Sequence, residues 1–390
     1  MATNRPDLLT RLAHAQAARA DADLLRRLRR VDDIDGRYRI IGGARLLNFA
    51  SNDYLGLAGH ARVREALVAA TRRWGVGAGA AHLLGGHSAE HEQLEIALAQ
   101  WTGRDRALLY TTGYMANLGV LGALLAKGDV CLQDKLNHAS LLDGARLSAA
   151  QLLRYVHADV ASARRHLDAH GDAATLLATD GVFSMDGDVA PLRELSGLCR
   201  ESGALLYVDD AHGLGVLGAD GAGSVAEAGL RQDDVPLLMG TLGKAIGVCG
   251  AFVAGSSAVI DGLLQFSRTF IYTTALPPAI AAATRAAVEI ARFESWRRER
   301  LNTLIAHFRH GAELRKLSLL PSRTPIQPLL IGDSARALQC SRDLETLGYF
   351  VPAVRPPTVP SGQARLRITL SALHSEADVE YLLDALASVS

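Results

Sequence analysis

The sequence predicts an α/β protein: a large domain with a mostly parallel sheet covered by helices, followed by a small α+β C-terminal domain. Between about residue 104 and residue 241, short apolar runs alternate with amphipathic stretches. This alternation is typical of the crossover units of parallel sheets. After Pro277 and Pro278 the chain continues as a long alanine- and arginine-rich helical stretch. Because 390 residues suffice for about two or three domains, the change of pattern indicates a second domain.

The expected elements follow one another along the chain. Strands are expected at 106–112, 129–134, 151–156, 174–183, 204–210 and 235–241. Helices are expected at 114–128, 138–150, 160–171 and about 191–202. The small domain should contain strands at 326–332 and 364–371, a helix at 334–348 and a final helix. We therefore expect an N-terminal helix and extension (1–45) packed with the small domain, a large cofactor-binding domain (46–290) and the small domain itself (291–390).

Composition excludes several classes of protein. Lysine plus arginine and aspartate plus glutamate number 41 each, for a formal net charge of +0, so nothing in the charge indicates a nucleic-acid binder. The N-terminal stretch has no secretory h-region, and no segment approaches the ~20 apolar residues of a membrane span. The cysteines Cys131, Cys199, Cys249 and Cys340 form no C-x-x-C pair, so we expect reduced core residues. A cytoplasmic protein with a small-molecule ligand is the expectation.

The stretch 240-GTLGKAIGVCG-250 sets Lys244 among glycines and small apolar residues. A phosphate loop of the form G-x-x-x-x-G-K-[ST] does not fit, because Leu238 and Ala245 stand where glycine and a hydroxyl residue are needed. A surface lysine is the commonest alternative. The third interpretation is an amine that forms a Schiff base with a carbonyl group, which requires a partly desolvated environment.

A second segment favours the Schiff base. The expected strand 204–210 ends in Asp209 and Asp210 with His212 close behind, and the expected strand 235–241 ends just before Lys244. Ligands of open α/β sheets bind at the carboxyl ends of strands, so a carboxylate, an imidazole and an amine can converge there. That trio suits pyridoxal 5'-phosphate, whose aldehyde the lysine holds while a carboxylate keeps the ring nitrogen protonated. Side chains alternate between the two faces of a strand, so Asp209 lies on the same face as Tyr207, whereas Asp210 points to the opposite face.

Several motifs, in order along the chain, resemble the α-oxoamine synthases, a family of fold-type-I pyridoxal-phosphate transferases. They are 51-SNDYLGL-57, 111-TTGYMANLGV-120, 134-DKLNHASLLDGARLS-148, 181-GVFSMDGDVAPL-192, 207-YVDDAHGLGVLG-218, 241-TLGKAIGVCG-250 and 272-YTTALPP-278. The family condenses an amino acid with an acyl thioester and releases carbon dioxide. The stretch 353-AVRPPTVPSGQARLRITLSALH-374 is similar to the member that acts on L-alanine and a pimeloyl thioester, carried by CoA or by a carrier protein, in biotin biosynthesis. The resemblance thus implies an acyltransferase.

The resemblance also implies roles at the cofactor. Lys244 would form the imine and act as the base, and Asp209 would face the pyridinium nitrogen. His212 and Ser184 would bond the phenolic oxygen, and His138 would stack on the ring. The phosphate would be bound by Gly113, Tyr114 and Thr241, and by Thr273 and Thr274 of a neighbouring subunit, which implies a homodimer with shared sites. A strand-to-helix turn such as the one at Gly113 attracts anions through its free N–H groups.

For the substrates, the resemblance implies a second set of residues. Asn52 and Arg367 would hold the carboxylate of the amino acid, since an arginine fork fits that geometry. Arg365 lies on the same face of its strand and could take the place of Arg367. Thr358, Arg355 and Arg26 would contact substrate, and the helix around Arg26 aligns equally well one residue away.

Three alternatives remain beside this interpretation. The run 87-HSAEH-91 fits the H-x-x-E-H zinc signature, but the preceding glycines indicate that the helix begins at about Ser88 and leaves His87 outside it; we therefore expect no metal. Sister reactions on the same fold are glycine C-acetyltransferase, serine palmitoyltransferase and 5-aminolevulinate synthase. A non-catalytic synthase subunit is the third, and the presence of Lys244, Asp209 and His212 argues against it.

Overall fold

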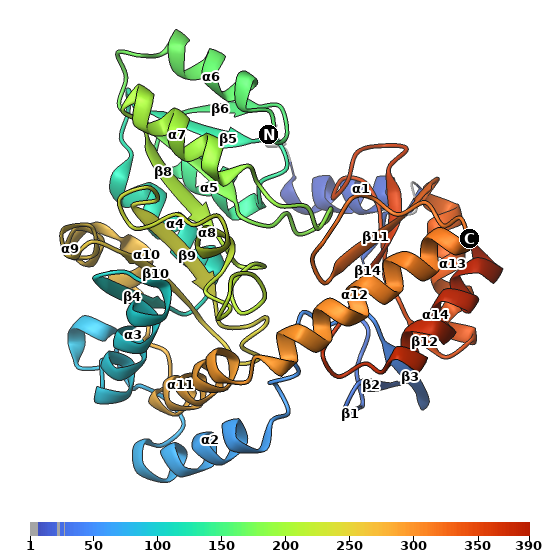
Figure 1. The fold of residues 1–390 in the computed structure, drawn as a ribbon. Helices are drawn as coiled ribbons and strands as arrows, with labels where there is room; N and C mark the ends of the chain where they lie inside the picture. The colour runs from blue at the N-terminus through green and yellow to red at the C-terminus, as the bar shows by residue number, and fades with distance from the viewer. Residues whose placement is uncertain (1–6, 22–23, 27) are drawn as a thin grey trace, which may run out of the picture.

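The computed structural model describes residues 7–21, 24–26 and 28–390. The chain forms two lobes, joined where helix α11 (Pro278–Phe293) runs into helix α12 (Trp296–Leu314) (Figure 1). Helix α11 packs on the large lobe against α2 (Ala61–Trp74) and α3 (Ala89–Thr102), whereas α12 packs on the small lobe against α14 (Glu376–Val389). Among the described residues, no helix combines the length and the apolar composition that crossing a membrane requires.

The large lobe is built on a seven-stranded sheet of order β4-β10-β9-β8-β7-β5-β6. Its strands are β4 (Arg106–Tyr110), β5 (Val130–Asp134), β6 (Gln151–Tyr155), β7 (Thr175–Asp180), β8 (Leu205–Asp209), β9 (Leu237–Thr241) and β10 (Ala251–Gly255). The strands β5 to β9 are mutually parallel, and β10 is antiparallel to both of its neighbours. The prediction of a mostly parallel sheet is confirmed, but β10 was not among the expected strands.

Helices cover both faces of this sheet because its strands are buried on both sides. One face packs against α4 (Gly113–Leu124), α5 (Ala139–Leu147), α9 (Ser257–Phe266) and α10 (Arg268–Ile271). The other packs against α6 (Val160–Ala169), α7 (Leu192–Ser202), α3 and α11. Two shorter elements are the 3-10 helix η1 (His82–Leu84) and α8 (Ser224–Glu227). Helix α4 was expected to reach residue 128 but ends at Leu124, because Leu125 has extended backbone angles and Gly128 has a φ of 103°.

The small lobe contains two sheets and joins both ends of the chain. One sheet has the order β11-β14-β13, with β11 (Ile326–Gly332), β14 (Ala364–Thr369) and β13 (Ala353–Val354) antiparallel. The other is β1 (Asp33–Asp35), β2 (Tyr38–Ile41), β3 (Ala44–Asn48) and β12 (Tyr349–Phe350). Helix α13 (Ser334–Thr346) completes this lobe. Residues 33–48 therefore belong spatially with the C-terminal part of the chain.

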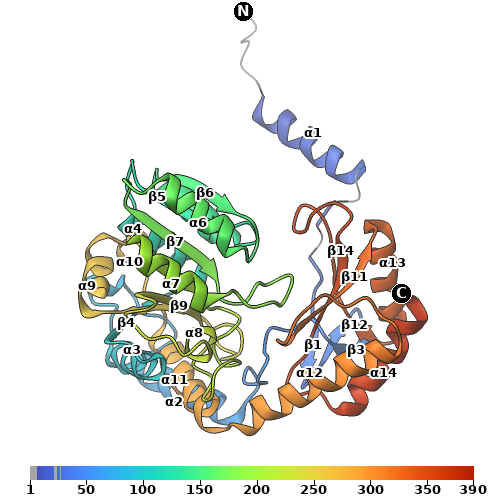
Figure 2. The ribbon, with the colours of Figure 1, turned by 45° about the horizontal axis from the view of Figure 1, so that its top comes forward.

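Two expectations about packing are wrong for the isolated subunit. Helix α1 (Leu8–Asp21), expected to pack with the small domain, contains no buried residue, and Figure 2 shows it standing away from the two lobes. Its apolar side chains, such as Leu9, find no surface of this subunit to cover. Cys131, Cys199 and Cys340 are buried free thiols as expected, but Cys249 is exposed, because it lies in the loop between Lys244 and β10 rather than in either element.

Candidate active site

A cavity of about 190 Å³ lies where β7, β8 and β9 end and α4 and α5 begin. Its walls hold most of the cofactor residues expected from the sequence. They are Gly113, Tyr114, His138, Ser184, Asp209, His212, Thr241 and Lys244, joined by Asn117, Ser140, Asp180, Ala211 and Met239. Segments from five separate parts of the chain therefore meet at the carboxyl edge of the sheet, where ligands of such folds bind.

Asp209 is fixed by its neighbours with its carboxylate in the cavity wall. One carboxylate oxygen accepts a hydrogen bond from Asn117 Nδ2 at 2.7 Å, and the other accepts from the Ala211 backbone N–H at 3.1 Å. Asn117 is itself oriented by Tyr207, whose hydroxyl donates to Asn117 Oδ1 at 2.6 Å. Asp210 lies on the other side, where it accepts from the Ser224 N–H, and burial raises its pKa to about 7. The strand alternation thus turns only the first carboxylate toward the cavity.

Lys244 and His212 form the centre of a hydrogen-bonded chain. Lys244 Nζ lies 2.7 Å from His212 Nε2, and His212 Nδ1 lies 2.6 Å from the Tyr54 hydroxyl. Tyr54 in turn donates to Asn52 Oδ1 at 3.3 Å. Burial lowers the pKa of His212 well below its usual range, and Lys244 lowers it further. A neutral imidazole can therefore accept from Lys244 while its other nitrogen donates to Tyr54.

Burial also lowers the pKa of Lys244 to about 8, although Asp209 and Asp180 work in the opposite direction. Desolvation disfavours the ammonium form, and a pKa of about 8 leaves roughly a tenth of this amine unprotonated at pH 7, far more than an exposed lysine has. This is the property that an imine-forming base requires. The surface-lysine interpretation is wrong, because Lys244 lines the cavity and is largely buried.

The part of the cavity wall where α4 begins is suited to an anion. Helix α4 begins at Gly113, and Thr112 caps it by accepting from the Met115 N–H at 3.1 Å. The N-terminus of a helix carries free N–H groups and a partial positive charge. Thr241, at the end of β9, lines the same cavity. His138 is the N-cap of α5, with Nδ1 2.7 Å from Ser140 Oγ, and burial lowers its pKa.

Arg367 and Arg365 both reach from β14 of the small lobe toward the large lobe but differ in their partners. Arg365 Nη1 lies 2.6 Å from Asp186 Oδ1 and forms an ion pair. Among the residues described, the partners of Arg367 are all neutral: the carbonyl of Ser184 at 2.7 Å, the hydroxyl of Thr369, and Asn52 Oδ1 at 3.3 Å and 3.4 Å. Arg367 therefore keeps an unneutralised positive charge for a bound anion, whereas Arg365 does not.

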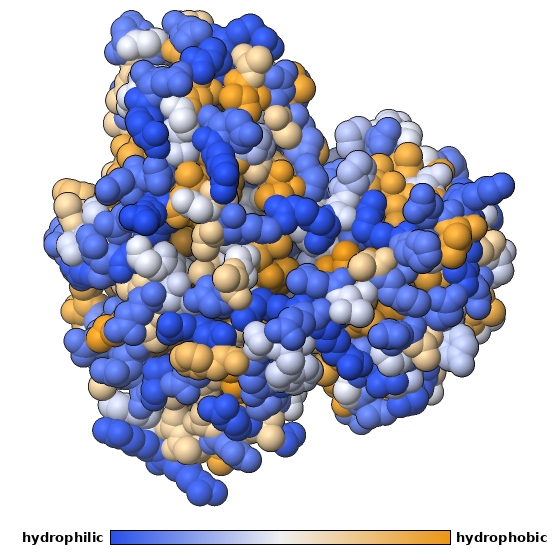
Figure 3. Space-filling model, viewed as in Figure 1, coloured by the Kyte–Doolittle hydropathy of each residue, from blue (hydrophilic) through white to orange (hydrophobic). Residues whose placement is uncertain are grey.

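A larger cleft of about 1130 Å³ runs from this site along the boundary between the lobes, and Figure 3 shows the hollow between them. Arg26 and Thr358 line it, together with Asn52, Arg365 and Arg367. Arg355 begins the turn that carries Thr358, whose N–H donates to the Arg355 carbonyl at 3.0 Å. Thr273 and Thr274 line neither cavity among the residues described; they lie just after α10, which packs on the same face of the sheet as α4 and α5.

Sequence reasoning missed several residues that shape the site. Asn117 clamps Asp209, and Tyr54 orients His212. Asp180 is buried beside Asp209 and accepts from the His138 N–H at 3.2 Å. The only available signal was that Asn117 interrupts the apolar run of α4 one turn after Gly113, on the same face of the helix. Nothing in the pattern indicated Tyr54.

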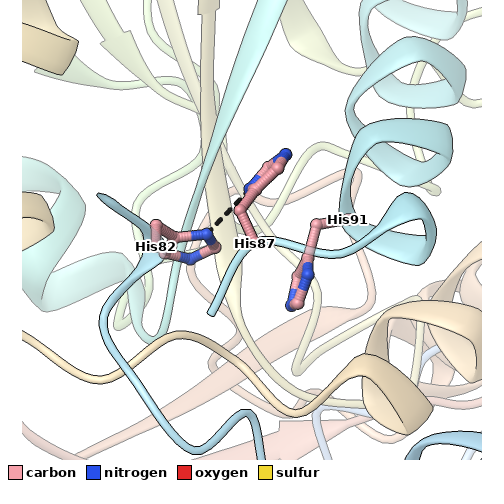
Figure 4. Close-up of side chains that lie close together, drawn as sticks. All are labelled: His82, His87 and His91. Carbon is pink, nitrogen blue, oxygen red and sulfur yellow. Dashed lines mark hydrogen bonds between the residues drawn. The ribbon is translucent and has the colours of Figure 1, made fainter. Parts of the chain in front are cut away.

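A separate cluster of imidazoles lies before α3. Ring nitrogens of His82, His87 and His91 all lie within 4.8 Å of one another (Figure 4). As expected from the sequence, α3 begins after its N-cap Ser88, and His87 lies outside the helix. The two histidines of the H-x-x-E-H run therefore do not share a helical face, although a shared face is the arrangement that this zinc signature requires.

Comparisons with known proteins agree with this architecture. The chain matches the family model of class I and II aminotransferases over residues 44–386. An 8-amino-7-oxononanoate synthase from Pseudomonas putida is 58% identical over 382 residues, covering 98% of this chain and 96% of the relative. A solved serine palmitoyltransferase from S. paucimobilis with bound PLP has a TM-score of 0.93 at 26% identity and covers 98% of both chains. A solved 8-amino-7-oxononanoate synthase from Francisella tularensis has a TM-score of 0.78 at 29% identity, covering 88% of this chain and 97% of that one.

Proposed function

This chain belongs to the class I and II aminotransferase family and, within it, to the 8-amino-7-oxononanoate synthases, and we propose that it condenses L-alanine with a pimeloyl thioester. It is a pyridoxal-phosphate-dependent acyltransferase of biotin biosynthesis. The products of the proposed reaction are 8-amino-7-oxononanoate, carbon dioxide and the free thiol of CoA or of a carrier protein. The observation that carries the proposal is the arrangement of Lys244, His212 and Asp209 around one cavity, beside an arginine that has no acidic partner in the described part of the chain.

The cavity fits pyridoxal 5'-phosphate at three points. Lys244 offers an amine whose pKa is lowered to about 8, and Asp209 offers a carboxylate held in place by Asn117. The start of α4 offers N–H groups to a phosphate, and Thr241 lines the same cavity. When bound, this cofactor supplies an aldehyde for the substrate amine and a protonated ring that withdraws electrons from the bonds to the α-carbon.

The residues around the cofactor would each fix one feature of it. Asp209 would hold a proton on the ring nitrogen, since a carboxylate within a few Å raises the pKa of a neighbouring cation by about 1–3 units. His212 and Ser184 would bond the phenolic oxygen, and His138 would lie against the ring face. All four side chains already line the cavity, so little rearrangement is required on binding.

The amino acid would be held by its carboxylate. Arg367 and Asn52 lie together in the wall of the cleft, where Arg367 donates to the Ser184 carbonyl and has no acidic partner among the residues that the structure describes. Lys244 Nζ would remove the α-proton, because its lowered pKa leaves a larger unprotonated fraction at neutral pH than an exposed lysine has. The ion pair between Arg365 and Asp186 favours Arg367 over Arg365 as the carboxylate receptor.

The acyl thioester would lie in the larger cleft. Thr358 and Arg26 line it, and Arg355 supports the turn of Thr358. We propose a homodimer in which Thr273 and Thr274 reach the cofactor phosphate of the neighbouring subunit. Apolar side chains beside these threonines support such an interface, because Val76, Leu83, Leu84 and Tyr272 are exposed in the isolated subunit.

The test is product analysis by mass spectrometry with purified protein. L-alanine, glycine and serine are each combined with pimeloyl-CoA, a pimeloyl carrier-protein thioester and acetyl-CoA. We expect 8-amino-7-oxononanoate with alanine and a pimeloyl donor, and little product from the other pairs. Turnover restricted to glycine with acetyl-CoA, or to serine with a long-chain donor, would replace the proposal with a sister reaction of the same fold.

A further inference from the structure

The histidine cluster before α3 is organised by hydrogen bonds around His91. His91 Nδ1 accepts from the Ser88 N–H at 2.9 Å, and Nε2 donates to the Leu276 carbonyl at 2.5 Å. These partners settle the tautomer and use both ring nitrogens. No lone pair of His91 is left for a metal ion, so the proximity of three imidazoles does not by itself make a metal site.

His82 and His87 extend the contact between two segments of the chain. The His82 ring stacks on Phe270 of α10 with ring centroids 4.8 Å apart, and His82 Nδ1 lies 2.9 Å from His87 Nδ1 (Figure 4). The backbone is joined as well, since Ala81 pairs with Thr274 in an isolated bridge and the Ala275 N–H donates to the Ala80 carbonyl at 3.0 Å. Residues 80–91 are thus fastened to residues 270–276.

The segment between α10 and α11, residues 272–277, has little secondary structure to hold it in place. It contains no helix or strand, and the two residues after Leu276 are prolines without N–H groups. Leu276 is buried, and the structure records no second hydrogen bond to its carbonyl oxygen among the residues described. The His91 side chain therefore satisfies a buried backbone acceptor that would otherwise be unpaired.

What this segment presents outward is a pair of hydroxyls. Thr274 is exposed and Thr273 is half-buried, and in the described part of the chain neither side-chain oxygen has a recorded hydrogen bond. Burial lowers the pKa of each of the three histidines, that of His82 to about 3, so the cluster stays neutral and adds no charge beside these hydroxyls. Two adjacent free hydroxyls at a surface are suited to an anion supplied by another subunit.

We propose that His91, supported by His82 and His87, is a positioning residue that sets the hydroxyls of Thr273 and Thr274 for the cofactor phosphate of the neighbouring subunit. This inference depends on the shared active site of the proposed function. It assigns a role across the dimer interface to side chains that do not touch the cofactor. Its consequence is that damage at His91 impairs the active site of the partner and spares its own.

The experiment uses mixed dimers of full-length subunits with two different affinity tags. One subunit carries Lys244→Ala and the other His91→Phe, which keeps a ring but removes both nitrogens. The His91→Phe homodimer should bind pyridoxal phosphate roughly 10- to 100-fold more weakly, with no change in affinity for pyridoxal, which lacks the phosphate. In the mixed dimer, the intact Lys244 site receives its threonines from the other subunit, so activity should return to about half that of wild type.

Two controls separate the possible failures. A mixed dimer of Lys244→Ala with Thr273→Ala/Thr274→Ala tests the shared site itself. If mixing does not restore activity in that dimer, both the shared active site and this inference are contradicted. Rescue of that pair without rescue of His91→Phe overturns the inference alone. His374→Phe is the matched control, because His374 also accepts from a backbone N–H and donates to a carbonyl, in the small lobe. Any loss it causes should not be rescued by mixing.

Two further measurements guard against misleading results. If His91→Phe does not fold, His91→Gln keeps a donor for the Leu276 carbonyl and should show a smaller loss that is rescued in the same mixed dimer. Zinc bound in equimolar amount by the wild type and lost in the His91 variant would overturn the assignment, because it would require ring nitrogens that the hydrogen bonds occupy.

Discussion

The Lys244 site and the His82 cluster are both groups of polar side chains in the large lobe, and they differ in what their polar atoms face. Around Lys244, groups from five parts of the chain surround a cavity of about 190 Å³. Around His82, the ring nitrogens face one another and the backbone, and His91 has both nitrogens paired. Both sets of histidines have lowered pKa values. A depressed pKa therefore marks burial in both places, and only a cavity with an available reactive group marks chemistry.

Replacing Lys244 tests the chemical side of this comparison most severely. We expect Lys244→Ala to lower turnover by at least about 10²–10⁴-fold, because the base and the covalent amine are lost together. Lys127→Ala is the matched control, since Lys127 is an exposed lysine after α4, and it should keep wild-type turnover. Turnover is measured with alanine and pimeloyl-CoA. Full activity in the Lys244 variant would contradict the proposed function.

The two arginines of β14 give the next largest effect. Arg367→Lys loses the planar fork and should raise the KM for alanine by about 10- to 100-fold. Arg365→Lys should raise it by less than about threefold, because Arg365 is already paired with Asp186. Steady-state kinetics on both variants, with alanine varied at fixed thioester, decides between them. Equal effects, or a reversed order, would show that the ion pair does not select the anion receptor.

The lowered pKa of Lys244 predicts how cofactor binding depends on pH. Only the unprotonated amine can react with the aldehyde, so association of pyridoxal phosphate with cofactor-free protein should accelerate as the pH rises through about 8. Below that value the rate should fall by about tenfold per pH unit. Stopped-flow absorbance measures the rate. A midpoint at the ordinary lysine value near 10.5 would show that burial does not perturb this amine.

His157, whose pKa is raised, contrasts with His82, whose pKa is lowered. His157 is half-buried between Asp134 at 3.0 Å and Asp188 at 2.8 Å. Burial opposes its charge, but the hydrogen bonds to the two carboxylates raise its pKa to about 10. Because the pKa is raised in the folded state, the stabilisation is complete below the unfolded value of about 6.5 and is lost as pH rises through about 10.

Substitution of His157 by glutamine should therefore cost about 1.5–3 kcal/mol in the free energy of unfolding at pH 6. The cost should shrink as the pH approaches about 10, where wild type itself loses the proton. Urea denaturation at several pH values measures both. The same substitution at His82, whose pKa is lowered to about 3, should show no such pH dependence across this range, because His82 is neutral throughout.

The sequence by itself determined the alternation of strands and helices and the convergence of Asp209, His212 and Lys244. Apolar runs of strand length must be buried, and parallel strands end at one edge, so side chains that follow β8 and β9 meet there. The choice of Asp209 over Asp210 for the cavity wall also follows from strand periodicity, and the structure turns the two carboxylates accordingly.

Contacts between distant segments were decided only by the tertiary structure. Asn117 clamps Asp209 from α4, Asp186 neutralises Arg365 across the lobes, and His91 holds the Leu276 carbonyl. The antiparallel insertion of β10 and the pairing of β3 with β12 were likewise decided by contacts between distant segments. Local periodicity specifies which face of an element is apolar, but it carries no information about which polar group a folded chain brings within hydrogen-bonding distance.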